Sequence, residues 1–292
     1  MLGAGGTATV DWGDGSASST TTSLSDLTPR YVNHEYQSEG DYVISIKPNG
    51  RYVAIGSKNL LQKSAASTAT SADRVYRSAL KKVEIGDKAK IYISAFDDFP
   101  CLQEITIPNT VTTIENYAFR YCHSLVSITI PNSVTSLGNN VFIESFSLRI
   151  VSLSNSITTV GSYLFQKCYA LASITIPGSI TTLGTYFVGT CDALTSVTMN
   201  RGITSIAAGG FAYNNALTYV IIPDSVTDIA SAFSSCSGVG EYHVYPTTPP
   251  TLATGGFSGI SSDCKIYVPA ESLSAYQSAT NWSNYASYMV GE

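Results

Sequence analysis

The chain is short of charged residues: Asp, Glu, Lys and Arg make up only 13% of its 292 residues, about half of their usual share. It has no basic cluster and its formal net charge is −5, which argues against nucleic acid or anionic lipid as the main partner. No apolar run approaches the length of about 18 residues that a membrane span needs. Serine, threonine and tyrosine supply the polar surface instead, a composition common in secreted and cell-surface proteins.

Histidine is also scarce, since the chain holds only His34, His123 and His243, far apart in sequence. No Gly-x-Ser-x-Gly or His-Glu-x-x-His pattern occurs, and no Cys-x-x-Cys motif or Cys/His cluster indicates zinc. Asp11 and Asp14 could help to bind calcium, but hydrogen bonds to their own turn are the simpler interpretation. We therefore expect a protein that is not an enzyme, with no catalytic residues, no cofactor and no metal site.

What the sequence does contain is a repeat of 23 residues. Each copy opens with the strand pattern Leu-x-x-Ile-x-Ile, continues through a proline and a turn residue, and reaches a phenylalanine further on. A fixed period of this length predicts a solenoid. The columns that carry the period are Pro108, Pro131, Pro177, Pro223, Pro246 and Pro269, Leu102, Leu125, Leu148, Leu171, Leu194 and Leu217, and Phe96, Phe119, Phe142, Phe165 and Phe211.

Residues 125–147 illustrate one repeat. The alternating start predicts a half-buried strand, Pro131 ends it because proline has no N–H to donate, Gly138 is expected to bend the chain, and Phe142 to fill the core. Ordering 23 residues costs more than one repeat gains by burial, so the repeats must stack and be capped. We count seven full repeats from about Leu80 to about Val239 and a degenerate one through residue 269. One residue is lost between 217 and 239.

Four of the six cysteines, Cys122, Cys168, Cys191 and Cys236, occupy one slot of the repeat, three residues after the phenylalanine position. Side chains in one slot form a ladder in the core rather than facing pairs. We therefore expect buried free thiols, with Cys168–Cys191 on adjacent turns as the best candidate for a disulfide if the geometry allows one.

The consensus L-x-S-I-T-I-P-x-S-V-T-x-I-G-x-x-A-F-x-x-C-x-x-L resembles the bacterial surface leucine-rich repeats of the BspA type over about residues 80–269. The copy at 142–154 departs from it, with Ser145 in the cysteine slot and Ser154 in the proline slot. The resemblance implies a mainly β, right-handed leucine-rich-repeat solenoid with a parallel sheet on its concave face. It also implies a secreted or surface-anchored adhesion protein and brings no catalytic residues.

The two ends differ from the repeats. Residues 10–16 (VDWGDGS) and 34–46 (HEYQSEGDYVISI) resemble the signature of the polycystic-kidney-disease (PKD) domain, over about half of such a domain. Either that sandwich is incomplete or its strands form the N-terminal cap of the solenoid. Pro269 and Glu271 suit the start of a helix, which predicts a helical C-terminal cap. We thus divide the chain into a partial PKD-like segment at 1–55, a linker or irregular turn at 56–79, the solenoid at 80–268 and the cap at 269–292.

The outward-facing strand positions are the best candidates for ligand contacts. Hydroxyl ladders are the simplest solution for an exposed parallel sheet, but these rows become apolar or aromatic in two places, as contact patches do. A second candidate is a loop-edge column of His123, Phe146 and Tyr169, whose rings could stack on a ligand or pack between loops. The expected ligand-binding residues are Arg149, Ile150, Ser152, Thr175, Thr198, Tyr219, Ile221 and His243.

Together these patterns predict a non-enzymatic bacterial binding or adhesion protein, secreted or on the cell surface. Its concave face would engage a host or extracellular protein, or a glycan. The alternative is a carbohydrate-binding accessory protein for polysaccharide capture. We expect a monomer without a membrane span. The start MLGAGGTATV lacks the features of a signal peptide, so we expect a processed or trimmed form.

Overall fold

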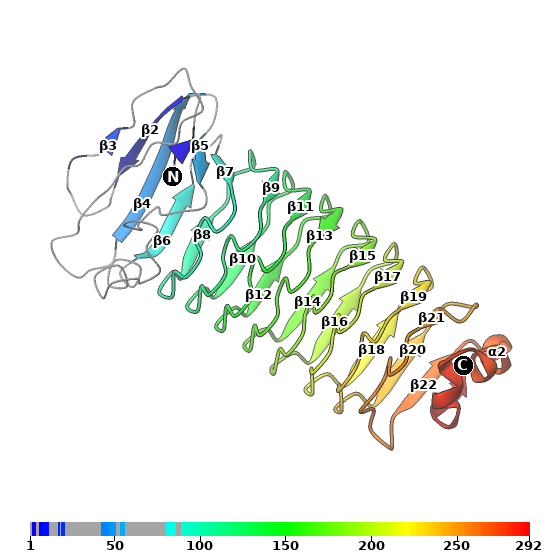
Figure 1. Cartoon of the computed structure of the whole chain (residues 1–292). Helices are drawn as coiled ribbons and strands as arrows, with labels where there is room; N and C mark the ends of the chain where they lie inside the picture. The colour runs from blue at the N-terminus through cyan, green and yellow to red at the C-terminus, as the bar shows by residue number, and fades with distance from the viewer. Residues whose placement is uncertain are drawn as a thin grey trace. The chain divides into compact units, whose positions relative to one another are not determined.

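The computed structural model describes the strands at 2–3, 6–11, 19–20, 42–50, 53–55 and 80–85, position 17, and every residue from 89 to 292. In this part of the chain, parallel strands stack as a β-solenoid of about nine turns, with short helices only near the C-terminus (Figure 1). The predicted mainly β solenoid is therefore confirmed. The chain divides into two compact units, Met1–Val151 and Ser152–Glu292.

Unit 1 begins with strands that extend the sheets of the repeats. In the first sheet β2 pairs with β4 in antiparallel fashion, whereas β4 pairs with β6, and β6 with β8, in parallel. β4 thus adds a strand to the parallel sheet, and β2 covers its edge as an N-terminal β cap. The sheet has the order β3-β2-β4-β6-β8, formed by Ser19–Thr20, Gly6–Asp11, Tyr42–Gly50, Leu80–Ile85 and Glu104–Thr106.

The second sheet of unit 1 repeats this arrangement. β1 pairs with β5 in antiparallel fashion, and β5, β7, β9 and β11 follow one another in parallel. These strands are Leu2–Gly3, Val53–Ile55, Ala89–Ile91, Thr113–Ile114 and Ser136–Leu137. The remainder of the PKD-like signature, at 12–16 and 34–41, lies outside the described residues, as does the predicted linker at 56–79.

The solenoid continues with the same two kinds of strand. β10 (Ser127–Thr129) pairs with β12 (Ile150–Ser152), and unit 2 holds three further paired groups and the short β13 (Thr159–Val160). The groups are β14 (Ser173–Ile176) with β16 (Ser196–Met199); β15 (Thr182–Leu183), β17 (Ser205–Ile206), β19 (Asp228–Ile229) and β21 (Thr251–Leu252); and β18 (Tyr219–Ile222), β20 (Glu241–Val244), β22 (Lys265–Val268) and β23 (Met289–Gly291).

The bend that the sequence suggested at Gly138 lies elsewhere. Asn140 and Glu144 both have φ of 58°, in the left-handed region that an L-residue adopts only at a cost. Gly138 is needed for a different reason: a Cβ atom at this position would lie 2.5 Å from the backbone nitrogen of Asn116 in the preceding turn. Glycine therefore permits the close approach of two turns, and the bend follows two residues later.

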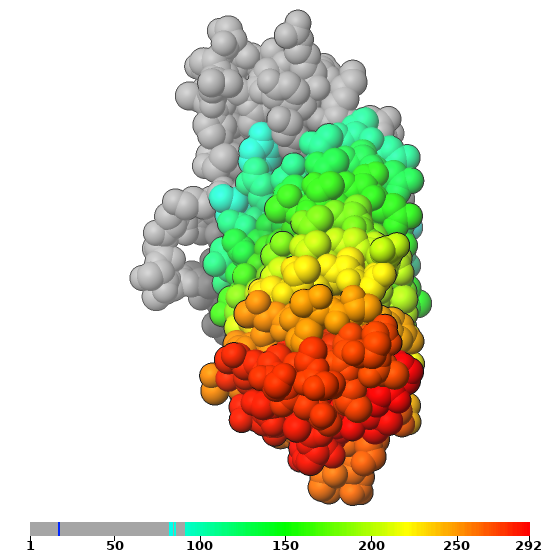
Figure 2. Space-filling view, turned by 90° about the vertical axis from the view of Figure 1, so that its right-hand side faces the viewer, coloured from blue at the N-terminus to red at the C-terminus, as the bar shows by residue number. Residues whose placement is uncertain are grey.

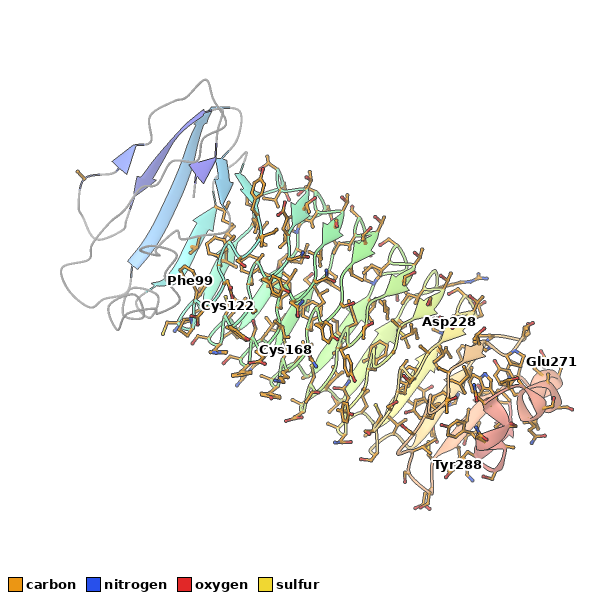
Figure 3. The ribbon with its side chains drawn as sticks, viewed as in Figure 1. Phe99, Cys122, Cys168, Asp228, Glu271 and Tyr288 are labelled. Carbon is orange, nitrogen blue, oxygen red and sulfur yellow. The ribbon has the colours of Figure 1, made fainter. Side chains whose placement is uncertain are left out.

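Buried phenylalanines form the core of each unit. In unit 1, Phe119 stacks between Phe96 and Phe142 with ring centroids 5.3 and 5.4 Å apart. In unit 2, Phe233 stacks between Phe211 and Phe257 at 5.3 and 5.8 Å. All are fully buried, so the predicted phenylalanine column fills the interior. Figure 3 draws the described side chains along the ribbon.

The cysteine slot holds hydrogen-bond donors, and we call it the donor slot; its positions are 122, 145, 168, 191, 214 and 236. The Cys122 thiol donates to the carbonyl of Phe96 at 3.2 Å, and the Ser145 hydroxyl donates to that of Phe119 at 3.2 Å. Asn214, which the sequence pattern did not assign to the slot, donates to Val188 at 2.7 Å. The slot therefore satisfies a buried carbonyl of the preceding turn rather than filling space alone.

All six cysteines are free, so the candidate disulfide Cys168–Cys191 does not form. Cys191 instead donates to the carbonyl of Phe165 at 3.2 Å, and Cys236 donates to that of Phe211 at 3.0 Å. The expectation of buried free thiols holds for four positions of the donor slot, because Cys122, Cys168, Cys191 and Cys236 are all buried.

The C-terminal cap consists of η1 (Ala270–Ser272), α2 (Leu273–Ser278) and η2 (Trp282–Tyr288), followed by β23. Figure 2 shows this segment in red, packed on the orange turns before it. Two buried side chains fasten it: the Tyr276 hydroxyl donates to the carbonyl of Pro246, and the Trp282 indole N–H donates to that of Pro250, both at 2.7 Å. The helical cap is as predicted, but the strand β23 that returns to the sheet was not anticipated.

Candidate functional site

The exposed rows of β14 and β16 carry hydroxyl groups, as the strand alternation predicts. Along each strand, exposed and buried residues alternate. Ser173 pairs with Ser196, and Thr175 pairs with Thr198, and all four side chains face solvent. Two rows of hydroxyl groups thus cover this part of unit 2.

The chemistry of the rows changes at β18, the next strand along unit 2 (Figure 1). Ile221 pairs with His243, His243 with Tyr267, and Tyr267 with Val290. In the neighbouring row, Tyr219 pairs with Glu241, and Glu241 pairs with Lys265. We call this surface the C-terminal face; it comprises Tyr219, Ile221, Glu241, His243, Tyr245, Lys265, Tyr267, Val290 and Glu292.

Aromatic rings meet at the centre of the C-terminal face. The imidazole of His243 lies between two phenol rings, with centroid distances of 4.9 Å to Tyr219 and 4.6 Å to Tyr267. The ring of Tyr245 approaches His243 edge-on at 6.4 Å. The His243 side chain is only 15% exposed, whereas Tyr219 and Tyr245 are 40% and 43% exposed. The nearly buried ring of His243 thus contacts the rings of the exposed Tyr219 and Tyr245.

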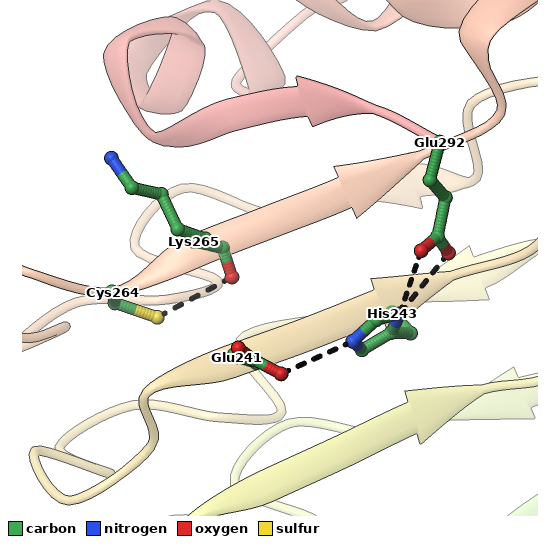
Figure 4. A network of polar contacts seen from close by, with 5 residues as sticks. All are labelled: Glu241, His243, Cys264, Lys265 and Glu292. Carbon is green, nitrogen blue, oxygen red and sulfur yellow. Dashed lines mark hydrogen bonds and ion pairs between the residues drawn. The ribbon is translucent and has the colours of Figure 1, made fainter.

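Two carboxylates flank the same histidine (Figure 4). The oxygens of Glu292 lie 3.0 and 3.1 Å from Nδ1 of His243, and Oε2 of Glu241 lies 3.4 Å from Nε2. Burial raises the pKa of the Tyr219 hydroxyl, and the neighbouring Tyr245, Glu241 and Glu292 raise it further. The charges of Glu241 and Glu292 therefore act on the hydroxyl of Tyr219.

The predicted ligand-binding residues fall into four places. Tyr219, Ile221 and His243 come together on the C-terminal face, and Thr175 and Thr198 lie in the hydroxyl rows of the same unit. Ser152 is exposed at the start of unit 2. The remaining two, Arg149 and Ile150, are exposed in unit 1, where Ile150 reaches 64%. As ligand contacts, all eight stay predictions.

The sequence pattern did not predict several residues of the C-terminal face, among them Tyr267 and Glu292. The step from Tyr219 to Glu241 is one residue short of the 23-residue period, and the step from Glu241 to Lys265 is one residue long. The two shifts cancel, so counting two full periods from Ile221 would have reached Tyr267, whereas one period from His243 reaches the buried Ile266. No position of the repeat corresponds to Glu292, because the helical cap lies between β22 and the C-terminal segment that contains Glu292.

The second candidate, the loop-edge column, is used for packing in unit 1. His123 stacks on Phe146 with centroids 4.4 Å apart, and its Nδ1 lies 2.7 Å from the carbonyl oxygen of Glu144. Both rings are half-buried. Tyr169, the third member of the column, belongs to unit 2 and is 37% exposed. The contacts of His123 favour packing between turns over a binding site.

Neither a metal centre nor a membrane-spanning helix is present among the residues whose placement is described. Within them, no group of three or more His, Cys, Asp or Glu side chains is arranged to hold a metal ion. The helices of this part of the chain include none with the length and apolar character of a membrane span.

Solved structures of leucine-rich repeat proteins are similar to this chain, and the one with a TM-score above 0.5 has the same fold. A leucine-rich repeat protein from Bacteroides ovatus is 18% identical, with a TM-score of 0.52, over 84% of this chain and 71% of that one. The leucine-rich repeat protein of T. pallidum is 26% identical, with a TM-score of 0.46, over 61% and 83%. A leucine-rich cell surface protein from Faecalibacterium prausnitzii is 20% identical, with a TM-score of 0.33, over 78% and 85%.

Comparison with curated proteins gives no match. Comparison with protein families matches the BspA type leucine-rich repeat region in six copies, over residues 89–216 and 204–285. These ranges lie outside the PKD-like segment, for which no family support was found. Proteins with this repeat generally act by binding. Because the match covers more than half of the sequence, the chain belongs to the BspA-type leucine-rich repeat family.

Proposed function

We propose that this protein is a non-enzymatic adhesion protein, secreted by a bacterium or displayed on its surface, and that it binds an extracellular ligand through the C-terminal face. Family membership supports the binding role and the location. The observation that carries the choice of face is the change along unit 2 from hydroxyl rows to a cluster of tyrosine, histidine and glutamate.

The composition of the C-terminal face suits recognition. Tyrosine is enriched at protein interfaces because it offers a large apolar surface and a polar hydroxyl. The exposed side chains of Tyr219, Tyr245 and Val290 are contributed by three strands or their immediate ends, on an otherwise polar surface. Strand pairing and the stacked His243 hold them in place, so little conformational entropy is lost on binding.

The test is a binding screen with matched variants. The wild-type protein is applied to arrays of extracellular matrix proteins and of glycans, beside the double variant Tyr219→Ser/Ile221→Ser. The control is Ser127→Ala/Thr129→Ala, which changes two exposed positions of β10 in unit 1. The proposal expects a ligand that the wild type and the control bind and the face variant does not.

Three results bear differently on the proposal. A ligand that the face variant binds as tightly as the wild type moves the site away from the C-terminal face. Binding confined to polysaccharides, and lost in the face variant, keeps the face but supports the role in carbohydrate capture. An absence of any ligand on both arrays, with a folded protein, contradicts the binding function itself.

A further inference from the structure

We propose that the C-terminal face binds a basic segment of a partner protein, one that presents arginine or lysine side chains. This inference rests on the proposed function and specifies the chemistry of its ligand. It is drawn from the charge of the last turns, the arrangement of carboxylates around His243 and the way in which the rings are stacked.

The C-terminal part of the chain, residues 202–292, carries an excess of negative charge. Residues 202–292 contain a single basic residue, Lys265, against six carboxylic acids. These acids do not form one surface: Glu241 and Glu292 lie on the C-terminal face, whereas Asp224 pairs with Arg201 at 3.0 Å and Asp228 accepts a hydrogen bond from Ser205 at 2.9 Å. The excess of negative charge in this part of unit 2 attracts a cationic partner and disfavours an anionic one. The six acids are Asp224, Asp228, Glu241, Asp263, Glu271 and Glu292.

Two of these acids stand beside the exposed tyrosines. Glu292 is positioned by His243, and the Glu241 side chain is 49% exposed one row away. A carboxylate accepts several hydrogen bonds, so the contact with His243 leaves acceptor capacity for a guanidinium or ammonium group. Exposed tyrosine rings also attract cations through their π faces. Tyr219 and Tyr245 are placed to make such contacts beside the two glutamates.

The stacking of the rings disfavours a glycan as the ligand. The His243 ring offers no open face for a sugar, because Tyr219 and Tyr267 lie on either side of it, so only the rings of Tyr219 and Tyr245 are left for stacking, and both lie beside carboxylates. A neutral glycan would also gain little from the negative charge, and an acidic one would be repelled. A basic protein segment uses both the carboxylates and the exposed ring surfaces.

The probe for the test is a fluorescein-labelled peptide of four Gly-Arg units. Its neutral counterpart carries citrulline, which has nearly the shape of arginine without the charge. Fluorescence anisotropy measures the affinity of each peptide for the whole protein at low and at moderate salt. We expect the arginine peptide to bind, the citrulline peptide to bind far more weakly, and added salt to weaken the arginine complex.

Two double variants separate a site from general attraction. Glu241→Gln/Glu292→Gln removes two charges from the face, whereas Asp263→Asn/Glu271→Gln removes two exposed charges outside it. The face variant should lose roughly twofold to thirtyfold in affinity, the range that two surface ion pairs support. The control should keep most of its affinity. Thermal melting of both variants verifies that they are folded.

Tyr245 gives an independent test of the aromatic contribution. Tyr245→Ser should weaken the arginine complex, and Tyr245→Phe, which keeps the ring, should retain it. Equal losses in the two double variants, or equal binding of the citrulline peptide, would overturn the inference. A glycan from the array screen that needs Tyr219 and Ile221 would also overturn it while leaving the proposed binding function standing.

Discussion

Asn214 offers a sharp test of the donor slot. Its side chain is fully buried and makes three hydrogen bonds. Nδ2 donates to the carbonyls of Val188 at 2.7 Å and Phe211 at 2.8 Å, and Oδ1 accepts from the backbone N–H of Cys191 at 2.8 Å. Asn214→Ala leaves all three backbone groups without this partner. Each unsatisfied buried group costs about 1–3 kcal/mol, and partial relaxation of the site lowers the sum.

We therefore expect Asn214→Ala to reduce the free energy of unfolding by about 3–5 kcal/mol. Asn214→Cys, which places the commonest residue of the slot there, keeps a donor for Val188 and should cost about half as much. Asn215→Ala is the control, because the exposed Asn215 side chain accepts hydrogen bonds from the equally exposed Ser237; its cost should stay below about 1 kcal/mol.

Urea denaturation followed by circular dichroism and by tyrosine fluorescence measures these differences, and coincidence of the two probes verifies a cooperative transition. The explanation of the donor slot fails if Asn214→Ala is no more destabilising than Asn215→Ala. It also fails if Asn214→Cys is as destabilising as Asn214→Ala, because the donated hydrogen bond would then contribute nothing.

Three further predictions follow from burial and close packing. Titration with a thiol reagent at pH 8 should find only the half-buried Cys101 in the native protein and six thiols after unfolding; several fast native thiols would contradict this. Burial raises the pKa of Cys236 to about 11 from about 9, so above pH 9 the unfolded chain loses a proton that the folded chain retains. Stability should then fall by roughly 1.4 kcal/mol per pH unit for each such thiol, which melting temperatures at pH 8 and pH 10 would reveal; equal values would refute it. Gly138→Ala should destabilise by about 1–3 kcal/mol because its Cβ would lie 2.5 Å from backbone, whereas Gly240→Ala, with a nearest contact of 3.8 Å, should change urea midpoints little; similar shifts would contradict the packing argument.

The solenoid was predictable because its information is local and repeated. Each copy carries its own strand, proline and phenylalanine, so one pattern read several times specifies the parallel stacking of the turns. The N-terminal strands were less predictable, since residues 10–16 and 34–46 suggested part of a separate sandwich. Which partner a strand chooses is a long-range matter: β2 and β4 pair with each other, and β4 also joins the parallel sheet.

The candidate site was predictable where it follows the repeat and hidden where it does not. Tyr219, Ile221 and His243 could be placed on one surface from strand alternation alone. Glu292 could not, because its position depends on a chain reversal through α2 and η2 that returns β23 to the sheet. The role of Asn214 was hidden for a related reason, since the carbonyl that it satisfies belongs to the preceding turn.

Hydrogen–deuterium exchange with a ligand from the array screen maps the binding site on the protein directly. We expect binding to slow exchange in β18, β20, β22 and β23, whose residues form or border the C-terminal face. Exchange in β8 and β10 of unit 1, which serve as internal controls, should change little. Protection concentrated in those strands, with β18 to β23 unchanged, would contradict the assignment of the ligand to the C-terminal face.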